Sequence, residues 1–290
     1  MMFRSFYFAL SLSFLIANDA VSQCNIVPDV KSPSIPDPCD QDRILRPFPM
    51  RTAFVRPSDL MWSKRTWRVL DMREKMNHPL YYPVEQTMCM KSLFDVLKCA
   101  ILENDLNAFA NPIFDDEFTT VMTKEEVRAM LISWDSTHQS EDVNNPGQYI
   151  ITPMKTEITS EKVRQYWIKE DWFFDKQRSV LEARIVGICP LVEKVSESGE
   201  FLGVKPLFWV YFPDARQYLA KAASFNSHND SERMSYDELF AKRKFASYVY
   251  KESNVYNRSI AEYKTGMDAL LESELIKEDI FNYESDLWHY

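Results

Sequence analysis

The chain has 290 residues, a formal net charge of −9 and 46% hydrophobic residues, which is enough apolar material for one or two folded cores. Its acidic balance, with basic residues scattered among acids, disfavours a nucleic-acid-binding protein. Only 5 glycines occur, and the absence of GxGxxG or P-loop strings weighs against nucleotide-binding folds, whose phosphate loops need glycine.

The N-terminus has the order of a secretory signal peptide. Arg4 precedes an apolar run over residues 6–17, and small residues follow. The run is shorter than the roughly 20 apolar residues that a membrane-spanning helix needs. We therefore expect residues 1–23 to be a signal peptide and the rest to be exported. Cys24 follows the expected cut and would permit a lipid anchor, but Gln23 is bulky where lipoprotein processing requires a small residue.

Residues 24–57 are rich in Pro, Asp, Ser and Arg and have neither helical nor alternating periodicity. We expect them to form an extended, Pro-rich arm. Two interpretations stay open: a disordered leader, and an arm that becomes ordered only against a neighbouring subunit.

A first helix is expected over residues 58–75, with Ser58 as its N-cap. Its apolar residues fall into two strips, one with Trp62 and the other with Trp67. Two strips on one helix indicate burial on two sides.

A second helix is expected over residues 87–103, where apolar residues make a stripe opposite charged ones. Thr123 and Glu126 have capping-box spacing for a short helix that ends at Leu131. Residues 135–147 are polar enough to be a surface loop.

The central segment has β character. Strands are expected over residues 149–158, 180–195 and 204–212, which together indicate an antiparallel sheet. Between the first two, Ser160 is expected to cap a helix that begins at Glu161.

The last third returns to helices. Ser235 and Glu238 have the spacing of another capping box. A helical stripe further on is formed by Ile260, Tyr263, Met267, Leu270 and Leu271. Helix, sheet and helix in blocks predict an α+β domain over residues 58–290: a central antiparallel sheet flanked by N-terminal and C-terminal helices, with the extended arm before it.

No residue pattern predicts chemistry. The four histidines lie far apart, and no HExxH, CxxC or GxSxG string occurs. An acid/base pair could be sought in the run that begins at Asp115 or in Asp171 with Asp175, but adjacency in sequence is poor evidence, and residues four apart on a helix would share a solvated face. We predict no catalytic, cofactor-binding or metal-binding residue.

The run Trp172, Phe173 and Phe174 stands between charged flanks. In a strand Trp172 and Phe174 point one way and Phe173 the other, so both faces need apolar cover. That cover is either the same domain or another chain.

Five cysteines are an odd number, so at least one is free or pairs outside the chain. If the helix over residues 87–103 is continuous, Cys89 and Cys99 lie about 15 Å apart, beyond the roughly 7 Å that a disulfide allows between Cα atoms. Cys24 and Cys39 are then the plausible local pair. Cys189, in an apolar strand, is expected to be a buried thiol.

Four blocks carry a family resemblance: MWSKRTWRVLDMREKMNHPLYYP, KEDWFFDKQRSVLEARIVGICP, LFWVYFPDAR and KESNVYNRSI. From about Arg56 to the C-terminus the sequence resembles the GldN/PorN family of the type IX secretion and gliding machinery of Bacteroidetes. The resemblance implies a periplasmic ring subunit under the outer membrane that assembles with copies of itself and binds the lipoprotein GldK/PorK. It also implies contact with the motor proteins GldL/PorL and GldM/PorM, attachment to the membrane only through the partner, and no catalytic residues.

Aromatic and basic side chains of the expected helix and strand are the candidate interface positions, because such residues dominate protein interfaces. They are Trp62, Arg65, Trp67, Trp172, Phe173 and Phe174. Two alternatives to the ring subunit are a periplasmic hydrolase that uses carboxylates or a metal, and a carbohydrate- or peptide-binding module with an exposed aromatic platform. A deep pocket with converging polar groups would favour the hydrolase, and full burial of the aromatics would exclude the platform.

Overall fold

The computed structural model describes residues 48–87, 90–135, 139–141, 149–151, 154–195, 200–225 and 234–287. The predicted signal peptide and the predicted pair of Cys24 with Cys39 lie outside these residues, as does most of the arm. Residues 48–56 of the arm are described. They form neither helix nor strand and continue into a 3-10 turn over Pro57–Asp59.

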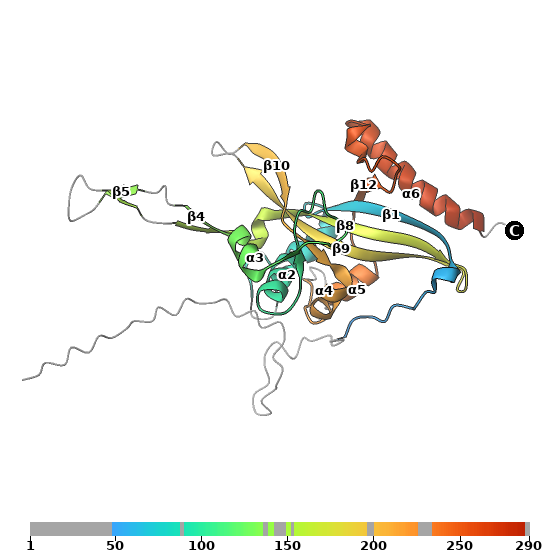
Figure 1. Ribbon diagram of the computed structural model, residues 1–290, viewed down its shortest axis with the longest axis horizontal. Coiled ribbons are helices and arrows are strands. Elements are labelled where there is room, and N and C mark those ends of the chain that lie inside the picture. Colours follow the sequence, from blue (N-terminus) through green and yellow to red (C-terminus); the bar gives the residue numbers. More distant parts are fainter. Residues whose placement is uncertain are drawn as a thin grey trace, which may run out of the picture.

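An antiparallel sheet with helices packed on it forms the body, which confirms the predicted α+β class (Figure 1). Within the described residues the sheet has 8 strands, in the order β12-β1-β8-β9-β11-β2-β3 with β10 paired to β9. The strands are β1 (Leu60–Asp71), β2 (Ala108–Phe109), β3 (Val121–Met122), β8 (Val163–Asp175), β9 (Val180–Val195), β10 (Phe201–Pro206), β11 (Trp209–Tyr211) and β12 (Tyr248–Glu252). The predicted strand over residues 180–195 is confirmed at both ends.

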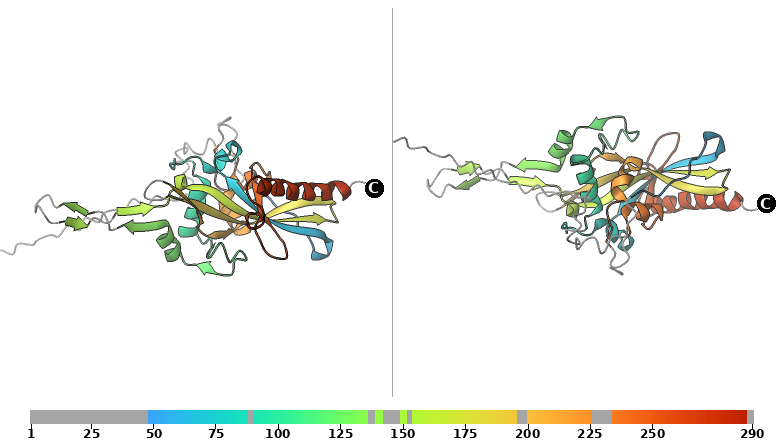
Figure 2. Two further views of the ribbon diagram at one scale, coloured as in Figure 1. Left: turned by 90° about the horizontal axis from the view of Figure 1, so that it is seen from above. Right: turned by 90° about the horizontal axis from the view of Figure 1, so that it is seen from below.

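Two ribbons outside the main sheet extend from the body (Figures 1 and 2). In the first, β4 (Ile132–Asp135) pairs with β7 (Met154–Glu157). In the second, β5 (Gln139–Glu141) pairs with β6 (Tyr149–Ile151). The prediction of a loop over residues 135–147 is therefore wrong at β5, because backbone pairing with β6 does not depend on polar side chains.

The predicted first helix is wrong, since residues 60–71 form strand β1. Every residue from Thr66 to Leu70 is buried, because β1 lies inside the sheet with both of its faces covered. A strand covered on both faces loses polar and apolar alternation, and its apolar residues can then match helical spacing.

The predicted helix after Ser160 is wrong for the same reason. Ser160 stands in a 3-10 turn (Ser160–Lys162), and its hydroxyl donates to the carbonyl oxygen of Val84 at 2.8 Å. Strand β8 follows directly and pairs with β1 on one side and β9 on the other.

Three short helices begin at a residue whose side chain caps the helix. Helix α2 (Leu93–Leu102) begins later than predicted because the Ser92 hydroxyl accepts from the N–H of Asp95 at 3.1 Å. The capping box of Thr123 is confirmed at α3 (Lys124–Leu131). The N-cap Ser235 is confirmed at α5 (Tyr236–Ala241). The other helices are α1 (His78–Tyr81), α4 (Phe212–Leu219) and α6 (Met267–Leu287), with 3-10 turns at Lys75–Asn77 and Ile260–Glu262.

The main core lies between the sheet and helices α2, α4 and α5. Leu70, Tyr166 and Ile188 are among its sheet residues, and Phe94 and Tyr236 come from the helices. The other side chains of the same strands enter a smaller aromatic cluster because successive residues point to opposite faces. That cluster contains Trp67, Phe109, Cys189 and Trp209.

At Gly187 of β9 the aromatic cluster packs directly against the backbone. A Cβ atom at Gly187 would lie 2.5 Å from the ring of Phe118 and 3.2 Å from Trp209. We predict that Gly187→Ala lowers the free energy of unfolding by about 1–3 kcal/mol, because the ring must move out of a packed cluster. Urea unfolding measures the change. A loss below about 0.5 kcal/mol would contradict the packing.

Helix α6 lies across the end of the sheet at β12 (Figure 2). Its buried residues are Ser273, Ile276 and Ile280, and the Ser273 hydroxyl accepts from the N–H of Val249 at 2.9 Å. Of the predicted helical stripe, Met267, Leu270 and Leu271 lie on α6 and are exposed, whereas Ile260 and Tyr263 lie before the helix at a 3-10 turn, so the stripe is not continuous. None of the helices in the described part of the chain is long and apolar enough to cross a membrane.

Cys99 in α2 forms a disulfide. Cys189 is free and buried, as predicted, so the second sulfur belongs to a cysteine outside the described residues. The predicted continuous helix over residues 87–103 is wrong, because α2 begins at Leu93. The condition under which Cys89 and Cys99 could not pair is therefore not met, and Cys89 lies outside the described residues.

Candidate polypeptide-binding groove and its arm

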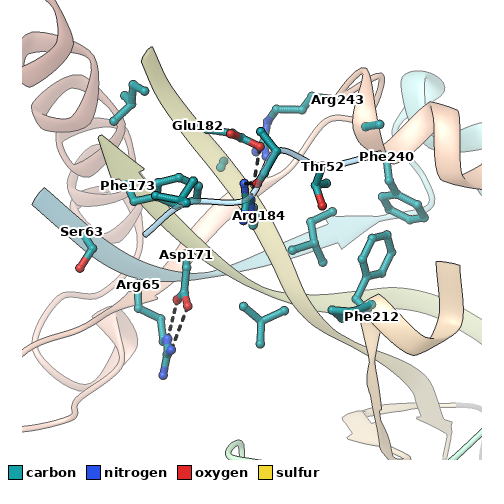
Figure 3. A pocket seen from close by; sticks show the side chains of 18 of the residues that line it. Thr52, Ser63, Arg65, Asp171, Phe173, Glu182, Arg184, Phe212, Phe240 and Arg243 are labelled. Carbon is teal, nitrogen blue, oxygen red and sulfur yellow. Dashed lines mark hydrogen bonds and ion pairs between the residues drawn. The ribbon is translucent and has the colours of Figure 1, made fainter. Parts of the chain in front are cut away.

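A groove of about 1220 Å³ runs beneath the described part of the arm (Figure 3). Its floor comes from β1, β8 and the first half of β9, and its far wall from α4 and α5. Residues 180–186 of β9 pair with β8 alone, since β11 reaches only Gly187 and Ile188. The groove thus follows an open edge of the sheet.

The arm lies in this groove through its backbone. The N–H of Met50 donates to the Asp237 carboxylate at 2.8 Å, and Arg216 donates to the carbonyl oxygen of Met50 at 2.5 Å. Arg184 donates to the carbonyl oxygen of Ala53 at 2.5 Å. All of these hydrogen bonds are made to backbone atoms of the extended arm, and none is made to an arm side chain.

Arg216 and Asp237 form the buried end of the groove. Their side chains are 15% and 2% exposed, and the guanidinium donates to both carboxylate oxygens at 2.6 and 3.2 Å. A two-point pair of this kind fixes both groups in one geometry. It therefore presents a donor and an acceptor to the arm at the same place.

The lining is basic, in contrast to the acidic chain. Seven cations and three carboxylates line the groove: Arg51, Lys64, Arg65, Arg178, Arg184, Arg216 and Arg243, against Asp171, Glu182 and Asp237. Each of those carboxylates pairs with an arginine. The hydrogen bonds between Arg65 and Asp171, at 2.6 and 2.9 Å, raise the pKa of the Arg65 guanidinium.

The carboxylates that the sequence offered for acid/base chemistry have structural roles. Asp115 accepts from the N–H groups of Glu117 and Thr120 and holds the loop between β2 and β3. Asp171 and Asp175 lie on strand β8, so the predicted solvated helix face is wrong. Asp175 is buried and accepts from Arg178, whose hydrogen bond lowers the pKa of this carboxyl. No cluster of histidine, cysteine and carboxylate side chains suited to a metal occurs in the described residues.

The candidate interface residues divide between two surfaces. Arg65 and Phe173 meet in the groove, where the Arg184 guanidinium lies 4.8 Å from the Phe173 ring centre (Figure 3). Trp62 and Trp172 lie on the other side of the strands and pack near α6; Trp62 stacks on Tyr283 at 4.6 Å.

Three of the six are buried within this chain: Trp67, Phe173 and Phe174 are 6%, 5% and 7% exposed. Both sides of the aromatic run are therefore covered largely by the domain itself, and no exposed platform of the predicted kind is formed. A role for any of the six at an interface stays a prediction.

Sequence reasoning missed the residues that hold the arm. Arg184, Arg216 and Asp237 lie on β9, α4 and α5, far from Met50 in the chain. When the partner of a charged residue lies far away in the chain, nothing in the neighbouring sequence indicates which residue it will contact.

The body is an α+β sheet domain whose groove holds an extended segment of the chain's own arm. Residues 55–289 match the family model described as gliding motility associated protein GldN, and the chain belongs to this family. It is thus a component of the gliding motility and type IX secretion machinery. The GldN family is not known as a family of enzymes. Among curated proteins, none matches the chain.

Proposed function

We propose that this protein is a structural periplasmic subunit of the type IX secretion ring beneath the outer membrane. In that ring it binds copies of itself and the GldK/PorK lipoprotein, which attaches it to the membrane. The ring supports protein export and gliding, and receives force from the GldL/PorL and GldM/PorM motor.

The observation that carries the proposal is a family match over almost the whole described chain together with a groove built for main chain. The carboxylates of the groove are neutralised by arginines, so they do not favour the hydrolase alternative. Acid/base catalysis needs a carboxyl group free to exchange a proton with a substrate.

The proposal is tested by capture of the lipoprotein. The tagged chain without residues 1–23 is expressed with the lipoprotein, purified in mild detergent, and its bound partner is quantified. We predict that the double variant Trp62→Ala with Trp172→Ala reduces capture by about tenfold or more, because both rings are partly exposed and truncated aromatic rings lose the contacts that dominate protein interfaces. Circular dichroism checks that the sheet is intact.

Phe114→Ala is the matched control, because Phe114 is an aromatic residue that is 91% exposed on the loop between β2 and β3. If the wild-type chain captures no lipoprotein, the partner is wrong. If the Trp variant either unfolds or captures normally while the control is normal, the two tryptophans are not part of the binding surface.

A further inference from the structure

Helix α6 has a second apolar face, which points away from the sheet. Five large apolar residues on it are each more than half exposed: Met267, Leu270, Leu271, Leu275 and Phe281. The residues that α6 buries against the sheet lie on the opposite side. An exposed apolar stripe of this length on a packed helix indicates an interaction surface.

The charge of α6 narrows what can cover that face. The helix carries seven acidic residues and one lysine: Asp268, Glu272, Glu274, Glu278, Asp279, Glu284 and Asp286, against Lys277. Two such helices repel each other, so the face does not suit a second α6. Asp268, Glu278 and Asp279 are exposed and form no ion pair within the described chain. They favour a partner surface that is both apolar and basic.

The arm supplies such a surface. Phe48 and Phe54 are 79% and 85% exposed because the groove holds the arm by its backbone and leaves these rings outside. Arg51 and Arg56 are exposed too, and residues 48–58 contain no acid. Neither arginine has an ion pair in the described part of the chain.

A third cation extends this surface. The backbone N–H of Lys176, in the turn after β8, donates to Asp59 at the end of the arm. Its side chain is exposed and has no acidic partner among the described residues. The arm face therefore offers two aromatic rings and three unpaired cations.

The two surfaces lie on different sides of the long strands. Helix α6 packs on β12 and against Trp62 and Trp172, while the arm contacts Arg184 along the open edge of β9 (Figure 1). One molecule can therefore use both surfaces at once. Unlike patches that join head to tail generate a ring when the rotation between copies closes.

We propose that the outer face of α6 in one copy docks on the arm-bearing face of the next copy. The leucines of α6 cover Phe48 and Phe54, and the acids of α6 pair with Arg51, Arg56 and Lys176. This contact rests on the proposed ring function and specifies how its copies meet.

Charge reversal with rescue tests the contact. One variant carries Asp268→Lys, Glu278→Lys and Asp279→Lys; a second carries Arg51→Glu, Arg56→Glu and Lys176→Glu; a third carries all six. Self-association of the chain without residues 1–23 is measured by sedimentation velocity, alone and with the lipoprotein. We expect each set of three to weaken self-association by about a hundredfold, and the combined variant to recover to within about tenfold of wild type.

The control reverses three exposed acids elsewhere, Glu103, Glu125 and Glu161, and should leave self-association unchanged. The double variant Leu271→Asn with Leu275→Asn tests the outer face of α6 without altering its charge. It should also weaken self-association. Circular dichroism confirms that each variant is folded.

Failure has distinct forms. If the variant with all six substitutions associates no better than the two variants with three substitutions each, the two faces do not meet. If the α6 variants lose lipoprotein capture but keep self-association, α6 docks on the lipoprotein instead. If wild type captures lipoprotein and assembles while no variant differs from it, this contact is wrong and the ring function stands. If wild type never self-associates, both are wrong.

Discussion

Asp237→Ala is expected to lower the free energy of unfolding by about 3–5 kcal/mol, because it leaves the Arg216 guanidinium buried without its carboxylate. The same change removes the acceptor for the Met50 N–H, so the arm loses one of its anchors. Urea unfolding measures the loss of stability. Lys221→Ala is the control, because Lys221 is exposed just after α4, the helix that carries Arg216. It should change the free energy of unfolding by less than about 0.5 kcal/mol.

A second variant separates the arm from the ion pair. Met50→Pro removes one backbone N–H and leaves Arg216 paired with Asp237. Trypsin should then cleave after Arg51 faster than in wild type, while the global unfolding transition shifts far less than in Asp237→Ala. Two results would show that the Arg216–Asp237 pair does not hold the arm. One is equal cleavage rates in wild type and Met50→Pro, and the other is a loss of unfolding free energy below about 1 kcal/mol for Asp237→Ala.

Breaking the Cys99 disulfide is expected to cost about 2–5 kcal/mol of stability. Cys99 is buried on α2, which packs in the main core. Without the disulfide the unfolded chain can adopt more conformations, and this gain in entropy favours unfolding. Cys99→Ala and reduced wild type should melt at a similar, lower temperature than oxidised wild type.

The reductant provides the control, because it should have no effect on Cys99→Ala. Cys189 should stay unreactive in the native state, since burial raises the pKa of its thiol. Peptide mapping under oxidising conditions identifies the cysteine that joins Cys99. A melting temperature that reductant leaves unchanged in wild type would contradict a stabilising disulfide.

The sequence predicts best where structure is local. The N-caps of α3 and α5 were found because Thr123 and Ser235 act within one helical turn. Strand β9 was found with both ends because its run is rich in β-branched residues and bounded by turn residues.

The errors arise where burial depends on the rest of the fold. The apolar spacing at the centre of β1 predicts a helix, because cover on both faces of the strand removes the alternation of polar and apolar residues. On α6 the apolar stripe was real, but periodicity cannot tell which of two apolar faces meets the sheet.

The groove was beyond sequence reasoning for a similar reason. Met50, Arg184, Arg216 and Asp237 come from four separate elements, and only the folded sheet brings them together. Of the predicted interface set, Arg65 and Phe173 were placed in the groove, while Trp67 entered the aromatic cluster. Substitution of Trp67, Phe173 or Phe174 will therefore report on folding, and the outer face of α6 is the better place to test assembly.

The central claim is that this chain works by joining other polypeptides, and its native mass tests that claim most directly. The purified chain without residues 1–23 is measured with and without the lipoprotein by light scattering after size exclusion. The account predicts a closed particle of many copies in the presence of the lipoprotein, with both proteins in it. A compact monomer that stays monomeric with the lipoprotein at micromolar concentration would contradict it.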